Sequence, residues 1–406
     1  MYRTVAFCLI IVFVLNACSP SVSTPSLIPT DPNSATAPEK MIGTKTPLPT
    51  KIPNLESPVT PTLIPSHTLG LITPSPLVTT PVNTTPVVST TESAESISEA
   101  IIIDHTSVEL FERIPEQYLT AARDLHMVYS DRSVGQNINE SLDCLTATSW
   151  STSMSGCRVD YYGRDGSTWL FKTFTQADYQ NNLVPARILF SPSPTQYNRS
   201  NWVFDARMGE WESLIAQFVE EVVPAHINNK DVLSFQFSYL NVLDGSTIDD
   251  PTEGFFSDQP HDGYYVNRER WDISDLEELE DRYPEKTFFY WTTSLARNVG
   301  SPDATNFNNQ MRQYVIANNK ILFDVADIES YDDRGNPCYD NRDGVEFCGK
   351  QGCENYSNDQ LDYPAICQDY TTEIDGGHLG TVSAGRIRLA KAYWVLMARI
   401  AGWDGK

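Results

Sequence analysis

Short apolar segments alternate with helical patterns between residues 107 and 401, and this alternation constrains the fold more than any other feature of the chain. Four segments are apolar and bounded by polar residues, as buried strands are: Leu125–Ser130, Val232–Leu240, Lys286–Thr292 and Ile321–Val325. Strand-like pieces also lie at Ser167–Phe174 and Ala186–Phe190. Helical periods occur at Ser107–Ala122 with a break at Pro115, and at Trp211–Val223, Ser274–Arg282, Thr305–Asn318 and Gly385–Ala401. This alternation predicts a parallel sheet that is covered by helices on both faces.

The first residues have the pattern of an export signal. A single charge at Arg3 precedes eleven apolar residues, Val5–Leu15, whereas a membrane-spanning helix needs about 20. The segment ends in Leu-Asn-Ala-Cys18, which resembles a bacterial lipobox with cleavage before Cys18 and a diacylglycerol on its thiol. We therefore expect residues 1–17 to be a lipoprotein signal peptide and the chain to be anchored on the outer face of a bacterial membrane. The alternative is an ordinary signal peptide with an incidental cysteine.

The segment after Cys18 has a composition that does not build a core. Residues 19–95 hold 15 of the 26 prolines, interspersed with threonine and serine. Such a composition favours extended, partly polyproline conformations. We expect residues 18–95 to be a disordered stalk and residues 96–406 to form the folded domain.

The charge of the chain argues against one class of partner. Acidic residues outnumber basic ones by 53 to 29, which gives a formal net charge of −24. Because phosphate binding requires a basic face, nucleic acid is not an expected partner. We expect a monomer that needs neither a metal nor another cofactor.

The cysteines predict disulfides. An exported chain would lose Cys8 with its signal and carry lipid on Cys18, which leaves an even number of cysteines in an oxidising compartment. Pairing of nearest neighbours is the simplest of the 15 connectivities: Cys144–Cys157, Cys338–Cys348 and Cys353–Cys367. A zinc site at Cys348 and Cys353 is the alternative, but no histidine lies nearby to complete it.

Ser133 is the first residue with a pattern that suggests chemistry. The apolar segment Leu125–Ser130 runs directly into Asp131-Arg132-Ser133, and a helical period begins at Ile138. Ser133 is therefore predicted on a strand-to-helix turn, where the positive end of the helix stabilises an alkoxide or an oxyanion. The alternative is that Ser133 caps the helix, since serine is a preferred N-cap residue.

His378 is the second such residue. Among the six histidines it alone follows a carboxylate, Asp375, by three residues with two glycines between them and a helix start close behind. This spacing lets Asp375 bond one imidazole nitrogen while the other nitrogen faces a reactive group, which is the arrangement of a general base that deprotonates a serine. The alternative is a polar turn whose Asp and His satisfy local backbone groups.

These residues occur in an order that resembles the SGNH (GDSL-like) hydrolase superfamily. The likeness lies in Ser133-Val-Gly-Gln-Asn-Ile138 and Asp375-Gly-Gly-His378-Leu379, and also in Asn308-Asn-Gln-Met-Arg312 and the segment 322–330. It covers roughly residues 123–403 apart from insertions near 146–202 and 328–370. The resemblance implies a flavodoxin-like three-layer α/β/α fold with a central parallel sheet, here with disulfide-tied loop insertions.

The resemblance also implies roles for individual residues. Ser133 would be the nucleophile, His378 the base and Asp375 the group that orients it. The Ser133 backbone N–H, Gly209 and the Asn241 side chain would form the oxyanion hole. The chain departs from the family pattern because Asp131-Arg132-Ser133 replaces Gly-Asp-Ser and no Gly-x-Asn-Asp pattern surrounds Asn241.

The expected function is a surface-tethered serine esterase that acts on acylated carbohydrate or other small esters. Two alternatives come from other classes of protein. One is a non-catalytic SGNH-fold lipoprotein that binds glycan or a partner. The other is an adhesion domain stabilised by Ca²⁺ on its acidic loops, although Asp340-Asn-Arg-Asp-Gly344 lacks the full set of calcium ligands.

Overall fold

The computed structural model describes most of the chain after residue 98. The described residues are 99–165, 168–207, 211–237, 246–249, 272–295, 302–339, 346–349, 352–355, 363–373, 378–380 and 382–406. The expected signal peptide, Cys18 and the stalk lie outside them. Within the described residues, no helix is long and apolar enough to cross a membrane.

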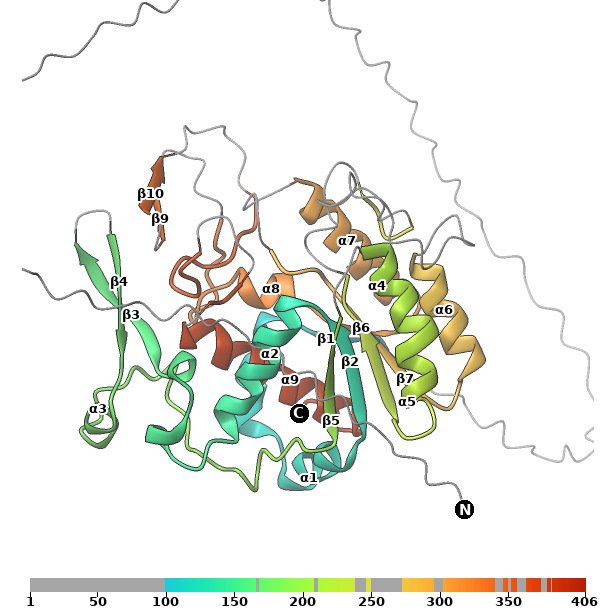
Figure 1. Cartoon of the computed structure of the whole chain (residues 1–406), viewed down its shortest axis with the longest axis horizontal. Coiled ribbons are helices and arrows are strands. Elements are labelled where there is room, and N and C mark those ends of the chain that lie inside the picture. Colours follow the sequence, from blue (N-terminus) through green and yellow to red (C-terminus); the bar gives the residue numbers. More distant parts are fainter. Residues whose placement is uncertain are drawn as a thin grey trace, which may run out of the picture. The chain divides into compact units, whose positions relative to one another are not determined.

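A six-stranded parallel sheet forms the centre of the domain (Figure 1). Its strands are β1 (Ile101–Ile103), β2 (Met127–Asp131), β5 (Trp202–Ala206), β6 (Val232–Phe235), β7 (Thr287–Trp291) and β8 (Ile321–Phe323). Their order is β1-β8-β7-β6-β2-β5, and each neighbouring pair is parallel. Without β1, the strands in chain order read 2-1-3-4-5 across the sheet, which is a doubly wound order. The predicted parallel sheet is confirmed.

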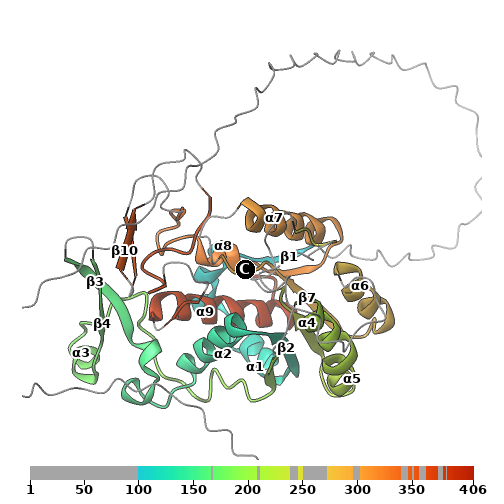
Figure 2. The same ribbon diagram turned by 45° about the horizontal axis from the view of Figure 1, so that its top comes forward.

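Alternate side chains of the strands enter two different hydrophobic clusters. In β2, Met127 and Tyr129 belong to one cluster and Val128 to the other; in β7, Trp291 and Tyr290 divide in the same way. Successive side chains of a strand point to opposite faces, so each cluster fills one face of the sheet. The result is a three-layer α/β fold (Figures 1 and 2).

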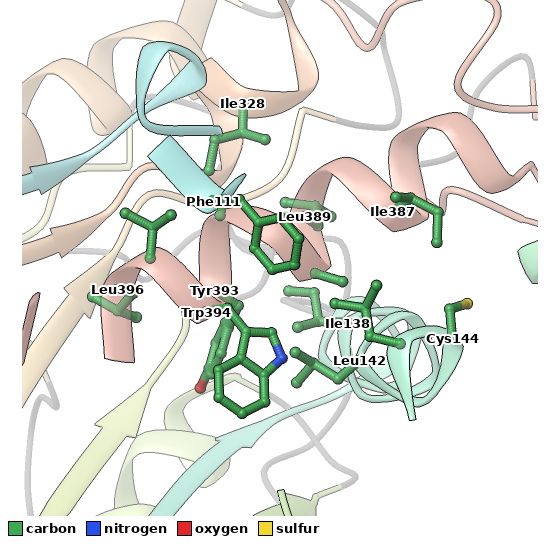
Figure 3. Packing of buried hydrophobic residues seen from close by; sticks show 14 of the residues in the cluster. Phe111, Ile138, Leu142, Cys144, Ile328, Ile387, Leu389, Tyr393, Trp394 and Leu396 are labelled. Atoms are coloured by element: carbon green, nitrogen blue, oxygen red, sulfur yellow. The ribbon is translucent and has the colours of Figure 1, made fainter. Parts of the chain in front are cut away.

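Helices from both ends of the domain cover the first face. They are η1 (His105–Arg113), α1 (Glu116–Asp124), α2 (Ser133–Leu145), α8 (Val325–Glu329) and α9 (Ser383–Ile400). Helix α9 is the central one, because its Tyr393 and Trp394 are fully buried and Leu389 packs in the same cluster as Phe111 and Ile138 (Figure 3). Pro115 separates η1 from α1, as predicted.

The second face is covered by helices from the middle of the chain. They are α4 (Trp211–Gln217), which continues through a π-helical turn (Phe218–Val222) into α5 (Val223–His226), α6 (Ile273–Arg282) and α7 (Pro302–Ala317). The helices predicted in these regions are therefore present, with small shifts of their ends.

The sequence predicted one strand that is absent from the structure and missed several that are present. Ala186–Phe190 forms a turn, in which Ile188 N–H donates to Pro185 O, because Ile188 and Phe190 are buried by packing and not by pairing. Strands β1 and β5 were not predicted. The strand predicted at Ser167–Phe174 is present as β4 (Thr168–Thr173). It pairs with β3 (Val159–Asp165), which was not predicted, and is followed by α3 (Gln176–Gln180).

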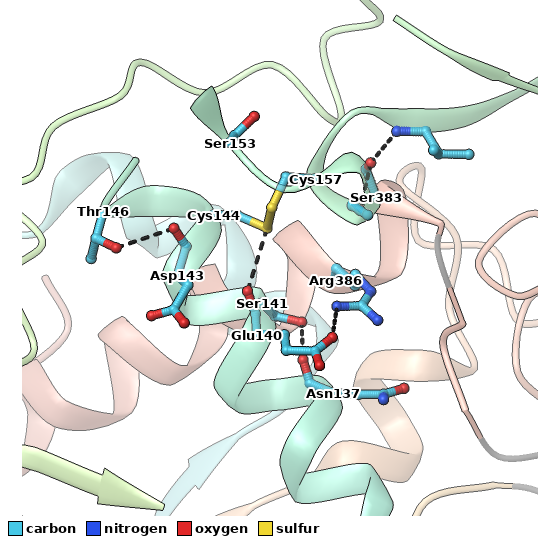
Figure 4. Close-up of a disulfide and its surroundings, with 12 residues drawn as sticks. Asn137, Glu140, Ser141, Asp143, Cys144, Thr146, Ser153, Cys157, Ser383 and Arg386 are labelled. Carbon is cyan, nitrogen blue, oxygen red and sulfur yellow. Dashed lines mark hydrogen bonds and ion pairs between the residues drawn. A yellow bond between two sulfur atoms is a disulfide. The ribbon is translucent and has the colours of Figure 1, made fainter. Parts of the chain in front are cut away.

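The disulfides differ in part from the nearest-neighbour prediction. Cys144 of α2 is bonded to Cys157, as predicted (Figure 4). Cys338 is bonded to Cys367, so the predicted pairs Cys338–Cys348 and Cys353–Cys367 are wrong. The physical reason is that the segment after residue 363 folds back on the segment after α8: Ala365 N–H donates to Cys338 O and Cys367 N–H to Glu329 O. The strands β9 (Glu346–Gly349) and β10 (Gly352–Asn355) form an antiparallel hairpin in which Cys348 and Cys353 are opposite each other.

Candidate functional site

The turn between β2 and α2 places Ser133 at the carboxyl edge of the sheet. Strand β2 ends at Asp131 and α2 begins at Ser133, whose side chain is exposed. The residue that caps the helix is Arg132, and its side chain makes no capping hydrogen bond. The interpretation of Ser133 as an N-cap is therefore wrong. In doubly wound folds the carboxyl edge of the sheet is where ligands bind.

The geometry of this turn depends on a close approach between Asp131 and Gly135. The Gly135 N–H donates to Asp131 Oδ2 over 2.6 Å, and the Tyr129 hydroxyl donates to Gly135 O over 3.3 Å. A Cβ atom at position 135 would lie 2.7 Å from both Asp131 Cβ and Phe204 Cε2. Only glycine fits there, so the tight start of α2 is fixed by residue type.

Asp131 is a buried carboxyl group two residues before Ser133 in the sequence. Burial raises its pKa to about 7, although hydrogen bonds from the Arg132 and Gly135 backbone and the charges of Arg132 and His378 lower it. The contribution of His378 indicates that its imidazole lies near the β2–α2 turn. Asp131 is therefore a group that changes charge near neutral pH next to the candidate nucleophile.

His378 is attached to the helix that begins at Ser133. The N–H of Leu379 donates to Asn137 Oδ1 over 2.9 Å. Asn137 follows Ser133 by four residues in α2, and residues four apart lie on the same face of a helix. Residues 133 and 378, which are far apart in the sequence, therefore belong to one corner of the domain.

Hydrogen bonds from nearby residues fix the orientation of His378. Its Nδ1 lies 2.9 Å from Glu373 Oε2, and its backbone N–H donates to the same oxygen over 3.3 Å. The hydroxyl of Thr371 donates to His378 O over 2.6 Å and accepts from Glu373 N–H over 3.0 Å. The imidazole therefore contacts a carboxylate through Nδ1, which is how a general base is commonly oriented.

Helix α9 packs against the residues that follow His378. The buried Arg386 donates from Nε to Gly380 O over 2.8 Å and forms an ion pair with Glu140 of α2 over 2.7 Å (Figure 4). A Cβ atom at Gly385 would lie 2.8 Å from Leu379 Cδ2, so the helix packs directly on this segment. Arg386 thus joins three parts of the site, namely α2, α9 and the residues after His378.

Some predicted site residues lie outside the described part of the chain, and one residue of the site was not predicted. Asp375, Gly209 and Asn241 lie outside the described residues, as do Cys18 and the loop 340–344. Glu373 was not predicted, although its carboxylate contacts His378. The signal for it was an acidic residue five positions before the histidine, in place of the three positions that the sequence analysis favoured.

The described residues contain no group of three or more His, Cys, Asp or Glu side chains arranged to hold a metal ion. Comparison of the chain with models of protein families, with characterised proteins and with solved structures found no match.

Proposed function

We propose that this protein is a serine ester hydrolase of the SGNH type that acts on acyl or acetyl esters of carbohydrate, or on other small esters. The observation that carries the proposal is the bond from Leu379 N–H to Asn137, which brings His378 to the helix that begins at the exposed Ser133. The strand order and the position of Ser133 at the carboxyl edge support it. The choice of substrate rests on analogy with the fold and on the expected surface location.

The proposed reaction begins with attack of Ser133 Oγ on the ester carbonyl carbon. His378 takes the hydroxyl proton at Nε2, and the carboxylate at Nδ1 stabilises the imidazolium that forms. The tetrahedral intermediate then expels the alcohol, which receives the proton from His378, and the acyl group remains on Ser133. Water attacks the acyl-serine while His378 accepts its proton, and the carboxylic acid leaves as Ser133 regains its hydrogen.

The start of α2 supplies donors for the oxyanion. The first backbone N–H groups of a helix have no acceptor within the helix, and the positive end of the helix dipole favours negative charge. The Ser133 N–H is the first proposed donor, with Gly209 and Asn241 as the two others. One such donor typically contributes about 10²–10³ in rate.

The N-terminal sequence supports a tethered enzyme. The lipobox-like end at Cys18 and the proline-rich stretch would hold the catalytic domain away from a bacterial membrane. An acidic, monomeric enzyme in that position would meet extracellular esters and not nucleic acid.

The proposal is tested by labelling the full chain with a serine-directed fluorophosphonate and mapping the adduct by mass spectrometry. We expect an adduct on Ser133 that is absent in Ser133→Ala and strongly reduced in His378→Ala. Ser155→Ala is the matched control, because Ser155 is an exposed serine of the inserted segment. Hydrolysis of p-nitrophenyl acetate should follow the same pattern.

The opposite result has a defined meaning. A folded chain with no adduct on Ser133 and no ester turnover would refute the esterase. Glycan binding that survives Ser133→Ala would then establish the non-catalytic module.

A further inference from the structure

The side chain of Glu373 makes two contacts with His378. Its Oε2 atom lies 2.9 Å from His378 Nδ1 and accepts a hydrogen bond from the His378 backbone N–H over 3.3 Å. The two side chains are 35% and 30% exposed, so the pair is only partly screened by water. One oxygen atom thus fixes both the position of the residue and the direction of its ring.

We propose that Glu373 is the positioning residue for His378, the part that the D-x-x-H spacing assigned to Asp375. This inference rests on the proposed function and refines it. Glu373 lies five residues before His378, so the spacing is E-x-x-x-x-H.

The contact determines which nitrogen of His378 carries the proton. An ionised carboxylate only accepts hydrogen bonds, so Nδ1 must be the donor in the neutral imidazole. The lone pair is then on Nε2, and Nε2 becomes the nitrogen that takes a proton from Ser133. Without this contact, the other tautomer would place the proton on the nitrogen that has to accept one.

The backbone around Glu373 is fixed independently of its side chain. Its N–H donates to the Thr371 hydroxyl, which also donates to His378 O, so Thr371 joins the two residues. Thr371 is 3% exposed. A few residues earlier, Tyr370 N–H donates to the carbonyl of the disulfide-bonded Cys367. Replacement of the Glu373 side chain should therefore change the ring of His378 more than the path of the chain.

The first test measures the tautomer of His378 and does not depend on catalysis. The ring nitrogen shifts of His378 in the full chain, labelled with ¹⁵N-histidine, report which nitrogen is protonated; His378→Gln assigns the signal. We expect the Nδ1–H form to be the majority in the unchanged protein and the minority in Glu373→Ala. Asp375→Ala is the matched control and should keep the Nδ1–H form as the majority.

The second test separates the charge of Glu373 from its capacity to accept a hydrogen bond. Glu373→Gln keeps an acceptor but removes the charge that stabilises the imidazolium. We expect its fluorophosphonate labelling rate to fall roughly 10–100-fold, and the acid limb of the rate-against-pH profile to move to lower pH. Glu373→Asp, which keeps the charge, should recover part of the rate. Asp131, on which the His378 charge also acts, is unchanged in all these variants.

The outcomes separate this inference from the proposed function. A switch of tautomer in Asp375→Ala, or no switch in Glu373→Ala, would overturn the role of Glu373 while Ser133 labelling could remain. If Ser133 is never labelled but the tautomer depends on Glu373, the esterase fails and the contact holds. Circular dichroism and the urea midpoint of each variant would show that the chain is folded.

Discussion

The two halves of the candidate site are held in place by different means. The Ser133 arm, residues 127–145, consists of β2 and α2 and is anchored by regular secondary structure and core packing. The His378 arm, residues 363–373 and 378–380, contains turns and one isolated bridge but no helix or strand among its described residues. Its position depends on side-chain hydrogen bonds, within the arm from Thr371 and Glu373 and from outside it from Asn137 and Arg386.

This difference indicates which property of the protein a substitution in each arm should change first. Changes to the buried residues of the Ser133 arm should disturb the core and lower stability first. The His378 arm also packs Ile366, Tyr370 and Leu379 into the core. No helix or strand fixes the path of its described residues, so its polar contacts and its disulfide should determine how His378 is placed. A disulfide and a buried acid lie in or beside each arm, namely Cys144–Cys157 with Asp131 and Cys338–Cys367 with Glu329, so matched variants can compare the arms directly.

Removing the disulfides should have the largest effect. The Cys144–Cys157 bond closes a loop of 13 residues that starts in the Ser133 arm, and Cys338–Cys367 closes a loop of 29 residues that ends in the His378 arm. In the chain-entropy model, the free energy of unfolding falls by about 3 kcal/mol and about 3.5 kcal/mol respectively. Urea unfolding of the two double Cys→Ala variants measures both values.

The two disulfide variants should differ more in the labelling of Ser133 than in their free energy of unfolding. In conditions where both variants are folded, labelling of Ser133 should fall more when Cys338–Cys367 is absent, because Cys367 leads into the segment that orients His378. Greater loss on removal of Cys144–Cys157 would show that the His378 arm is not the weaker half.

Gly135→Ala should give the next largest effect and acts on the Ser133 arm. The added Cβ would lie 2.7 Å from Asp131 Cβ and Phe204 Cε2, so strand β2 and helix α2 would have to separate. Overpacking of this kind costs about 1–3 kcal/mol, which a urea transition would detect. Gly163→Ala is the control, since nothing lies within 4 Å of a Cβ at that position, and it should change the free energy of unfolding by less than about 0.5 kcal/mol.

The contrast between the arms also explains what the sequence could and could not predict. The β2–α2 turn at Ser133 is local, since an apolar segment, a glycine and a helical period adjoin it, and the structure confirms the turn. The approach of Glu373 to His378 depends on the path of a loop, and spacing alone favoured Asp375. The pairing of Cys338 depends in the same way on a segment that folds back on α8.

The strands also differ in how much of their position the local sequence predicts. β2, β6, β7 and β8 are apolar and central or nearly so, and the pattern identified them. β5 and β1 lie at the two edges of the sheet, and most of their residues are only partly buried. Edge strands bury less surface, so their sequences carry less of the strand pattern.

Two buried acids, Asp131 in the Ser133 arm and Glu329 beside the His378 arm, should make stability depend on pH. Burial raises the pKa of Asp131 to about 7 and that of Glu329, whose carbonyl accepts from Cys367 in the His378 arm, to about 8. Ser294 and the Leu295 backbone donate to Glu329 and oppose this shift. Both acids keep their proton in the folded chain over a range in which the unfolded chain has lost it.

Since the folded state binds more protons above about pH 4, each acid lowers the free energy of unfolding as pH rises towards its folded pKa, by at most about 1.4 kcal/mol per pH unit. Urea midpoints at pH 5, 6, 7 and 8 should fall less steeply in Asp131→Asn and Glu329→Gln. Glu329→Gln should flatten the curve up to about pH 8 and Asp131→Asn only to about pH 7. An unchanged slope in either variant would show that its acid is ionised in the folded chain.

Asn137→Ala should have the smallest effect on stability and a clear effect on the site. It removes the acceptor for Leu379 N–H, and loss of one such hydrogen bond costs about 0.5–1.5 kcal/mol. The bond is the direct connection between the two arms, so Ser133 labelling should fall several-fold although the fold is kept. Asn139→Ala, two residues further along the same helix, is the control and should leave labelling unchanged. If Asn137→Ala labels Ser133 at the normal rate, the other contacts of the His378 arm place His378 without the bond from Leu379 N–H to Asn137.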